Sequence, residues 1–414
     1  MPPTRPTADQ RPIAPSTMTH PPLLRPSTER RQFLRQTLAA SPALALACQP
    51  SAWAQGGSET AGVAPLKAPT APRNAVLPLR FPRDFGSHPE QAIEWWYITG
   101  NAAAGERLFG FQLTFFRAKV RGNERLRSAF AAHQLILGHA ALTDLQGQRL
   151  WHEQRSARQG LGLSQAAEDD TNLLLHPWTL KRQALPSGSR YEARLRSAHF
   201  SLLLDFQATQ PVLLQGQQGW SQKGPAAAQF SHYYSEPQMA VTGELVLEGR
   251  RYRLNTPSSD LSQPGRAWLD HEWSDQLMSG EAQGWDWLGM NLFDGTALMA
   301  FRMRHKDGST QWDASTWRGP DGRTHSAPRG STHWVPGARW RSPRTQADYP
   351  IEWTLTCPLG EFRVKALLAD QELDSRHSTG NVYWEGLSEL YDLQGRCVGR
   401  GYVELTGYAE TLRL

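Results

Sequence analysis

Residues 285–304 read WDWLGMNLFDGTALMAFRMR, and this stretch decides the fold class. Two runs rich in aromatic and aliphatic residues, Trp285–Phe293 and Thr296–Arg304, flank the pair Asp294-Gly295. Asp-Gly is a preferred pair for two-residue turns between antiparallel strands, because both positions need a positive φ. The stretch therefore predicts a β-hairpin.

A two-residue turn also predicts which side chains share a face of this hairpin. It pairs Phe293 with Thr296 and, further along, Asp286 with Met303. Asp286 is then the only charged residue on a face that otherwise holds Leu288, Met290, Leu292, Ala297, Met299, Phe301 and Met303. An unpaired carboxylate in such surroundings keeps its proton and can donate it. The alternative is an Asp at a barrel rim or bonded to a nearby backbone N–H.

The opposite face of the predicted hairpin carries aromatic and basic residues. In this register Trp287 lies beside Arg302, and Trp285 lies near Arg304. A guanidinium over an indole ring is a favourable cation–π arrangement. We therefore expect this face to be held by cation–π stacking.

Alternating apolar and polar residues predict further strands along most of the chain after residue 78. Ile93–Gly100 and Leu108–Phe116 flank the small-residue turn Ala102–Gly105 and form a second predicted hairpin. The other predicted strands are His133–Thr143, Tyr191–Phe206, Val241–Leu247, Ile351–Thr356, Glu361–Leu368, Val382–Glu389 and Gly399–Tyr408. Short strands at even spacing with Gly-rich turns predict an all-β protein of sandwiches or barrels.

A stretch rich in Ser and Pro, Asn255–Gly265, divides these strands into two blocks. We therefore expect an N-terminal β-domain over residues 79–255 and a C-terminal β-domain over residues 256–414. The segment before them is rich in Gly, Ala and Pro without periodicity, which predicts a flexible linker over residues 55–78.

The first 54 residues have the features of an export signal. Ser27–Leu34 reads STERRQFL, Leu38–Ala47 is mildly apolar, and the small-residue site Ala52–Ala54 precedes Gln55. This order predicts a twin-arginine signal peptide over residues 1–54, and hence a periplasmic or secreted protein that meets the Tat export machinery. Anchoring as a lipoprotein through Cys48 is the alternative.

Composition narrows the classes of partner. The chain has 414 residues and a formal net charge of +5, and residues 1–54 hold six basic and two acidic side chains. The remainder is close to neutral, so nucleic acid, which binds basic surfaces, is not an expected partner.

The 16 Trp residues indicate large aromatic interiors. Cys357 and Cys397 could form a disulfide in an oxidising compartment or stay as two buried thiols.

Eight short strings, taken in order, resemble one known family. They are EWWY at 94–97, GFQLTFFR at 110–117, HAALTD at 139–144, YYSEP at 233–237, WLDHEW at 268–273, GWDW at 284–287, YWEG at 383–386 and GRGYVELTGY at 399–408. Their order and spacing are similar to those of the AttH-like, carotenoid 1,2-hydratase-related family of lipocalin-like proteins. The resemblance implies two calycin-type β-barrels packed together and an apolar, lipid- or isoprenoid-like ligand. Members outside the carotenoid hydratases are often labelled secreted hydrolases.

The string Asp270-His271-Glu272-Trp273 carries the candidate chemistry. On a strand, Asp270 and Glu272 point to one side and His271 and Trp273 to the other. The resemblance implies that His271 and Trp273 belong to an active site, because the carotenoid hydratases have a similar His-x-Trp. Those enzymes also rely on a Tyr-x-Asp pair downstream, and the matching residues here, 298–302, contain neither Tyr nor Asp.

Either Asp270 or Asp286 replaces the missing acid, or the chain no longer hydrates carotenoids. In an enzyme, the acid would protonate a trisubstituted C=C bond. Trp273 and Trp285 would stabilise the resulting cation, and water oriented by His271 would add to it.

Three further residues, Glu94, Trp96 and Tyr234, are candidates for lining a ligand cavity. The alternative is that they seal a barrel end or fill a core. No metal site or cofactor is expected, because His-Glu-x-x-His, Cys-x-x-Cys, P-loop and Gly-x-Gly-x-x-Gly motifs are missing from the sequence. A Gly-x-Ser-x-Gly elbow is missing too, which argues against a serine hydrolase.

The residues and the resemblance together predict an exported lipocalin-like protein that binds an apolar lipid, fatty acid or isoprenoid and hydrates or hydrolyses it. The alternative is a non-catalytic periplasmic lipid carrier or an accessory factor of an exported complex. Peripheral contact with a membrane is compatible with both.

Overall fold

The computed structural model describes residues 78–128 and 130–412. The expected signal peptide, the alternative anchor at Cys48 and nearly all of the expected linker lie outside these residues, so they stay predictions. Within the described part, the helical content is the short 3₁₀ turn η1 (Arg83–Phe85). No helix there has the length and apolar character needed to cross a membrane.

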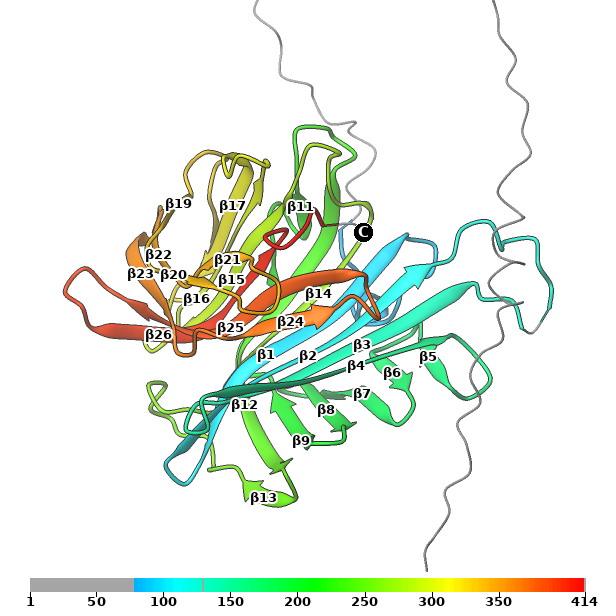
Figure 1. The fold of residues 1–414 in the computed structure, drawn as a ribbon, viewed down its shortest axis with the longest axis horizontal. Coiled ribbons are helices and arrows are strands. Elements are labelled where there is room, and N and C mark those ends of the chain that lie inside the picture. Colours follow the sequence, from blue (N-terminus) through cyan, green and yellow to red (C-terminus); the bar gives the residue numbers. More distant parts are fainter. Residues whose placement is uncertain (1–77, 129, 413–414) are drawn as a thin grey trace, which may run out of the picture. The chain divides into compact units, whose positions relative to one another are not determined.

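Fourteen strands of the described chain form the first sheet, which is antiparallel (Figure 1). In hydrogen-bonding order they are β4 (Arg149–Arg158), β3 (Gln134–Asp144), β2 (Arg107–Lys119), β1 (Ile93–Ala104), β14 (Arg266–Gln276), β12 (Phe230–Leu247), β9 (Phe200–Gln207), β8 (Gly188–Arg196), β7 (Trp178–Leu185), β6 (Asn172–Leu175) and β5 (Ser164–Ala166). The short strands β10 (Leu213–Leu214), β11 (Trp220–Gln222) and β13 (Arg250–Arg253) pair with β12 outside this path. Because β3 also lies against β5 and β6, the sheet curls into a nearly closed barrel.

The second sheet has ten strands in the described chain and is also antiparallel. In order they are β18 (Thr324–Ser326), β17 (Thr310–Arg318), β16 (Ala297–Arg304), β15 (Gly284–Leu292), β26 (Cys397–Thr406), β25 (Asn381–Tyr391), β23 (Gly360–Ala366), β22 (Glu352–Cys357) and β19 (His333–Pro336), with β24 (Glu372–Ser375) paired to β25. β20 (Arg339–Arg341) and β21 (Asp348–Pro350) form a separate two-stranded sheet. The predicted all-β fold of two antiparallel, lipocalin-like barrels is confirmed.

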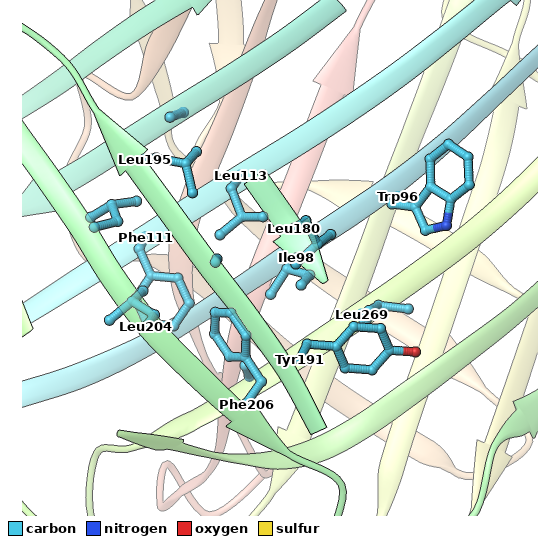
Figure 2. Close-up of a cluster of buried hydrophobic side chains, with 14 of the residues drawn as sticks. Trp96, Ile98, Phe111, Leu113, Leu180, Tyr191, Leu195, Leu204, Phe206 and Leu269 are labelled. Atoms are coloured by element: carbon cyan, nitrogen blue, oxygen red, sulfur yellow. The ribbon is translucent and has the colours of Figure 1, made fainter. Parts of the chain in front are cut away.

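Side-chain alternation along the strands creates one apolar core inside each sheet and a third between them. Figure 2 shows part of the first core, which includes Trp96, Ile98, Phe111, Leu113, Tyr191, Phe206 and Leu269. The second core includes Leu288, Met290, Leu355, Trp384 and Val403. The third, which includes Tyr97, Trp268, Trp287, Phe301 and Tyr402, lies where the outer face of the first sheet meets the second. Trp287 donates a hydrogen bond to the Tyr233 hydroxyl across this junction, with a distance of 3.0 Å.

The break between the two sheets lies later in the chain than we predicted from the sequence. β14 follows the predicted boundary at residue 255/256, yet it is hydrogen-bonded between β1 and β12 in the first sheet. The N-terminal unit therefore extends to Gln276, and the second sheet begins at Gly284. The Ser/Pro-rich stretch is a loop that leads into β14, which still belongs to the first sheet. Its composition therefore does not indicate the change from one sheet to the other.

The predicted hairpins form, but the register of the Asp-Gly hairpin differs by one residue. Leu292 N–H donates to Thr296 O at 2.8 Å, and Gly295 has a φ of +91°, so the loop has three residues. The Asp294 carboxylate accepts a hydrogen bond from Thr296 N–H at 2.8 Å, which favours this longer turn. Asp286 is consequently opposite Arg302, whereas the two-residue turn paired it with Met303.

The two cysteines that the sequence left open are free thiols in the structure. Cys357 is buried at the end of β22, and Cys397 is half-buried at the start of β26. Burial raises the pKa of both thiols, which disfavours the reactive thiolate.

Candidate functional site

β14 supplies side chains to both faces of the first sheet. His271 and Trp273 point into the interior of the barrel, where Trp273 belongs to the first core. Asp270 and Glu272 point outward, toward the second sheet, and line a cavity there. The predicted division of this string between two sides of a strand is confirmed, and it separates two candidate sites.

The first site is a buried polar group, which we call the interior cluster, made of His88, Glu94 and His271. Nδ1 of His88 lies 2.7 Å and Nε2 of His271 lies 2.9 Å from the same carboxylate oxygen, Oε1 of Glu94. The other oxygen, Oε2, accepts hydrogen bonds from Nε of Arg117 at 2.7 Å and from the backbone N–H of His88 at 2.9 Å. The Glu94 carboxylate therefore has four donors, which compensates for its complete burial.

These contacts fix the charge states within the interior cluster. Burial opposes ionisation of Glu94, but hydrogen bonds from His271 and His88 hold its pKa well below the usual range. Burial lowers the pKa of His271 to about 4, so this ring is neutral at pH 7. The pKa of His88 is raised in spite of burial, because the ring also contacts Asp84 at 3.2 Å.

Aromatic rings enclose the interior cluster. Trp273 stacks on His88 with 3.7 Å between ring centroids, and Trp96 stacks on His271 at 4.4 Å. The Tyr234 hydroxyl lies 3.0 Å from Nδ1 of His271. Five residues that the sequence nominated are thus brought together here: Glu94, Trp96, Tyr234, His271 and Trp273.

The second site is a cavity of about 330 Å³ between the two sheets, which we call the inter-sheet cavity. β1, β2, β3 and β14 of the first sheet form one wall, and β15, β16, β25 and β26 of the second form the other. Much of the lining is apolar and includes Ile93, Trp95, Leu137, Leu277, Trp287 and Phe301. Glu94 and Arg117 also border it, so the interior cluster lies next to this cavity.

Besides Glu94, four acidic residues line the inter-sheet cavity: Asp270, Glu272 and Glu385, which are buried, and Glu404, which is half-buried. Glu272 is neutralised by Lys223, whose Nζ lies 2.8 Å from Oε1. Burial raises the pKa of Asp270 to about 7, although Tyr233, Ser235 and Trp268 all donate hydrogen bonds to it.

Glu385 and Glu404 form a carboxyl pair on neighbouring strands. They are register partners on β25 and β26, where Glu385 is buried and Glu404 is half-buried. Glu404 accepts one hydrogen bond from Nε1 of Trp285 at 3.0 Å, whereas Oε2 of Glu385 has no partner among the residues that the structure describes. Burial raises the pKa of Glu404 to about 7, and burial together with the charge of Glu404 raises the pKa of Glu385 well above its usual value. With these raised pKa values the pair is partly protonated near neutral pH, so one carboxyl can act as an acid and its neighbour as a base.

Asp286 is not the lone carboxylate that the sequence predicted. It points into the core of the second sheet, where Oδ2 lies 2.7 Å from Nε of Arg302 and Oδ1 lies 2.9 Å from Nε of Arg304. The Tyr408 hydroxyl donates a third hydrogen bond at 3.0 Å. The one-residue change of register brought these arginines onto the face of Asp286, and this ion-pair cluster does not border the inter-sheet cavity.

The predicted cation–π pairs of the hairpin are wrong for the same reason. Arg302 lies over Trp353, with 5.1 Å to the ring centroid, and Arg304 lies over Tyr408 at 4.0 Å. Trp285 instead faces the inter-sheet cavity and holds Glu404. Its nomination as a ligand-contacting residue thus remains compatible with its position.

The functional residues that sequence reasoning missed have no local signature. His88 stands outside any ligand motif, in the segment between η1 and β1. Glu385 and Glu404 both occur in the strings that resemble the family, but only the pairing of β25 with β26 makes them neighbours. A pair of acidic residues on adjacent strands can therefore be recognised only when the order of the strands in the sheet is known.

Comparison with known proteins places the chain in a family. A family model described as AttH-like matches residues 71–408, and none of the curated proteins matches the chain. The crystal structure of an AttH protein from Nitrosomonas europaea is 39% identical and has a TM-score of 0.73, covering 82% of this chain and 100% of that one.

Two more distant structures have the same fold. Kievitone hydratase from Nectria haematococca is 14% identical with a TM-score of 0.62, covering 83% of this chain and 97% of its own. CghA in complex with Sch210972 is 13% identical with a TM-score of 0.53, covering 80% and 94%. The match of the family model over most of the chain and the 39% identity to a solved member agree: this protein belongs to the AttH-like family.

Proposed function

We propose that the protein is a hydratase-type enzyme that adds water to a C=C bond of an apolar small molecule bound in the inter-sheet cavity. The observation that carries the proposal is the Glu385–Glu404 carboxyl pair, which faces an apolar cavity without a basic partner among the described residues. The cations that line the cavity are paired with other acids: Lys223 lies 2.8 Å from Glu272, and Arg117 lies 2.7 Å from Glu94.

The size and lining of the cavity suit a small apolar ligand. Its volume of about 330 Å³ falls at the lower end of the range for small-molecule sites. The aromatic side chains that line it include Trp95, Trp285, Trp287 and Phe301. Their π faces attract a cation that forms on the ligand.

The reaction follows from the raised pKa values of the carboxyl pair. The protonated member of the pair donates its proton to one carbon of the double bond, so the π bond breaks and a C–H bond forms. Water attacks the other carbon, a C–O bond forms, and the water proton passes to the ionised member of the pair. One water is consumed, and the carboxyl pair returns to its starting protonation.

The relatives support this choice of reaction class. One structural neighbour is a hydratase by name, kievitone hydratase, and it shares the fold over nearly its whole length. At 14% identity that likeness concerns the fold, so the carboxyl pair of this chain carries the chemical argument. In contrast to the interpretation from the sequence, this assigns the acid to Glu385 and Glu404 and not to Asp286.

A non-catalytic lipid carrier is the second candidate, and the largely apolar cavity lining favours it. A carrier has no use for a carboxyl group that keeps its proton near neutral pH, whereas an acid catalyst requires one. From the twin-arginine pattern we further propose that the protein acts outside the cytoplasm, whether it hydrates its ligand or carries it.

Isotope incorporation tests the proposal and separates the two candidates. The purified chain is incubated in H₂¹⁸O with a prenylated phenol or a short isoprenoid alcohol, and products are read by mass spectrometry. We expect labelled water to be added, and Glu385→Gln and Glu404→Gln to reduce the rate by about 100-fold or more. Glu361→Gln, an acid on the surface of β23, is the matched control and should match wild type.

The alternative outcomes are distinct. Saturable binding of these probes without any product, in wild type and variants alike, would support the carrier and reject the hydratase. Product formation that survives both substitutions would reject the carboxyl pair as the acid.

A further inference from the structure

We propose that the interior cluster binds one divalent transition-metal ion of the Zn²⁺ class through Nδ1 of His88, Oε1 of Glu94 and Nε2 of His271. These three atoms all lie within 4.8 Å of one another, and all three side chains are buried. This site is separate from the proposed hydration chemistry, because its ligands are not the carboxyl pair.

The donor set is of the kind that such ions select. Two imidazole nitrogens and one carboxylate oxygen are typical ligands of Zn²⁺, at distances of roughly 2.0–2.2 Å. Both imidazoles already converge on a single oxygen, at 2.7 Å for His88 and 2.9 Å for His271. An ion bound between these three atoms would replace the two hydrogens that now link the imidazole rings to Glu94. The ligand atoms need to move apart by only a few tenths of an ångström to make room for it.

The groups behind the ligands form a complete outer shell. In metal sites, the second nitrogen of a ligating histidine donates to a carboxylate, a carbonyl or a similar acceptor, which fixes the ring. Here Nε2 of His88 faces Oδ1 of Asp84 at 3.2 Å, and Nδ1 of His271 faces the Tyr234 hydroxyl at 3.0 Å. Once the coordinating nitrogens lose their hydrogens, the remaining N–H groups point at these two acceptors.

The remaining oxygen of Glu94 is equally fixed. Oε2 is held by Nε of Arg117 at 2.7 Å and by the backbone N–H of His88 at 2.9 Å, which leaves Oε1 for the ion. Stacking of Trp273 on His88 and of Trp96 on His271 holds both ring planes. All three ligands are thus oriented before an ion binds, as is expected of a structural metal site.

The three ligands come from separate segments, which suggests what the ion does. Glu94 is on β1 and His271 is on β14, the neighbouring strand, whereas His88 belongs to the segment that joins η1 to β1. The same segment is otherwise held by contacts such as that of Ser87 N–H with Ala167 O at 2.7 Å. A bound ion would link the segment between η1 and β1 to strands β1 and β14 of the barrel, and it would raise the free energy of unfolding.

Metal content of the full chain without a histidine tag tests the proposal. The protein is treated with chelator, dialysed against Zn²⁺ or Co²⁺, and analysed by mass spectrometry for the metal and by the visible absorption of Co²⁺. We expect about one ion per chain, an intense tetrahedral Co²⁺ band and a higher thermal midpoint with Zn²⁺. His88→Gln should lose all three, and Asp84→Asn should weaken affinity about 10–100-fold.

His232→Gln is the matched control. His232 also packs on Trp273, with 5.3 Å between ring centroids, but it is not a member of the cluster. It should bind the ion as wild type does. A wild-type protein that retains no ion, a His88→Gln variant that binds as well as wild type, or loss of binding in His232→Gln would each overturn the proposal. His88 lies outside the strands, so its variant remains informative even where Glu94→Gln fails to fold.

Discussion

Replacing Glu404 by Gln should make the protein more stable at alkaline pH, an unusual result for a substitution in a buried site. Glu404 is half-buried, faces Glu385 on the next strand and accepts one hydrogen bond from Trp285. Burial raises its pKa from 4.5 to about 7, so the folded protein prefers the protonated form. Gln is close to that form in shape and has no charge to bury.

The magnitude follows from the displacement of the pKa. A rise from 4.5 to about 7 is about 2.5 pH units, and each unit corresponds to about 1.4 kcal/mol. Between these values the folded state binds more protons than the unfolded chain, so the stabilisation present below pH 4.5 is lost as the pH rises through 7. The stability of Glu404→Gln relative to wild type should therefore increase by about 3 kcal/mol between pH 4 and pH 8.

Urea unfolding followed by tryptophan fluorescence at pH 5, 6, 7 and 8 measures this difference. Glu272→Gln is the control of opposite sign, because Glu272 is paired with Lys223 at 2.8 Å. Its removal leaves a buried ammonium without its partner and should destabilise the fold. Unfolding curves of wild type and Glu404→Gln that shift in parallel with pH would refute the reasoning, since they would mean that Glu404 is ionised in the folded protein as it is in water.

Three further outcomes are expected. Asp286→Ala should lower the free energy of unfolding by about 3–5 kcal/mol, measured by urea titration, because it leaves two buried arginines unpaired; a loss under 1 kcal/mol would contradict this. Trp273→Ala should cost about 3–5 kcal/mol in the same assay through the cavity it leaves beside the interior cluster, and an unchanged midpoint would argue against the packing described. Arg30→Lys combined with Arg31→Lys should hold the precursor in the cytoplasm in a cell-fractionation experiment, whereas unchanged export would reject the twin-arginine signal.

Local patterns predicted the features that depend on one strand. The alternation of Asp270-His271-Glu272-Trp273 between two faces is a property of strand geometry with a period of two residues, and it holds in the structure. This alternation needs no knowledge of which strands are neighbours. Glu94, Trp96 and Tyr234, in contrast, meet His271 only because β1 and β12 pair with β14. Trp96 and Tyr234 belong to the first core there, and Glu94 borders the inter-sheet cavity, so a role of these residues in ligand binding stays a prediction.

The features that failed depend on more than one strand. The face shared with Asp286 was wrong because the Asp294 carboxylate stabilises a three-residue loop, and a shift of one residue exchanges every cross-strand partner. The boundary at 255/256 was wrong because β14 returns to pair with β1, some 160 residues earlier in the chain. Glu385 and Glu404 could not be joined without knowing that β25 and β26 are adjacent.

β14 brings these two kinds of information together. Successive side chains of β14 point to opposite faces of the sheet, so His271 contacts the interior cluster and Asp270 lines the inter-sheet cavity. Both sites exist only because the strands around them are arranged in this order. Because the strand lies between β1 and β12, in the middle of the first sheet, its backbone is fixed on both sides. Substitutions at neighbouring positions of one strand should then affect different properties. Changes at Asp270 should act on the cavity and its protons, and changes at His271 on metal binding and the attachment of the η1 segment. If substitutions at both positions produced the same defect, the two faces would share a single function, and the separation of hydration chemistry from the metal site would fail.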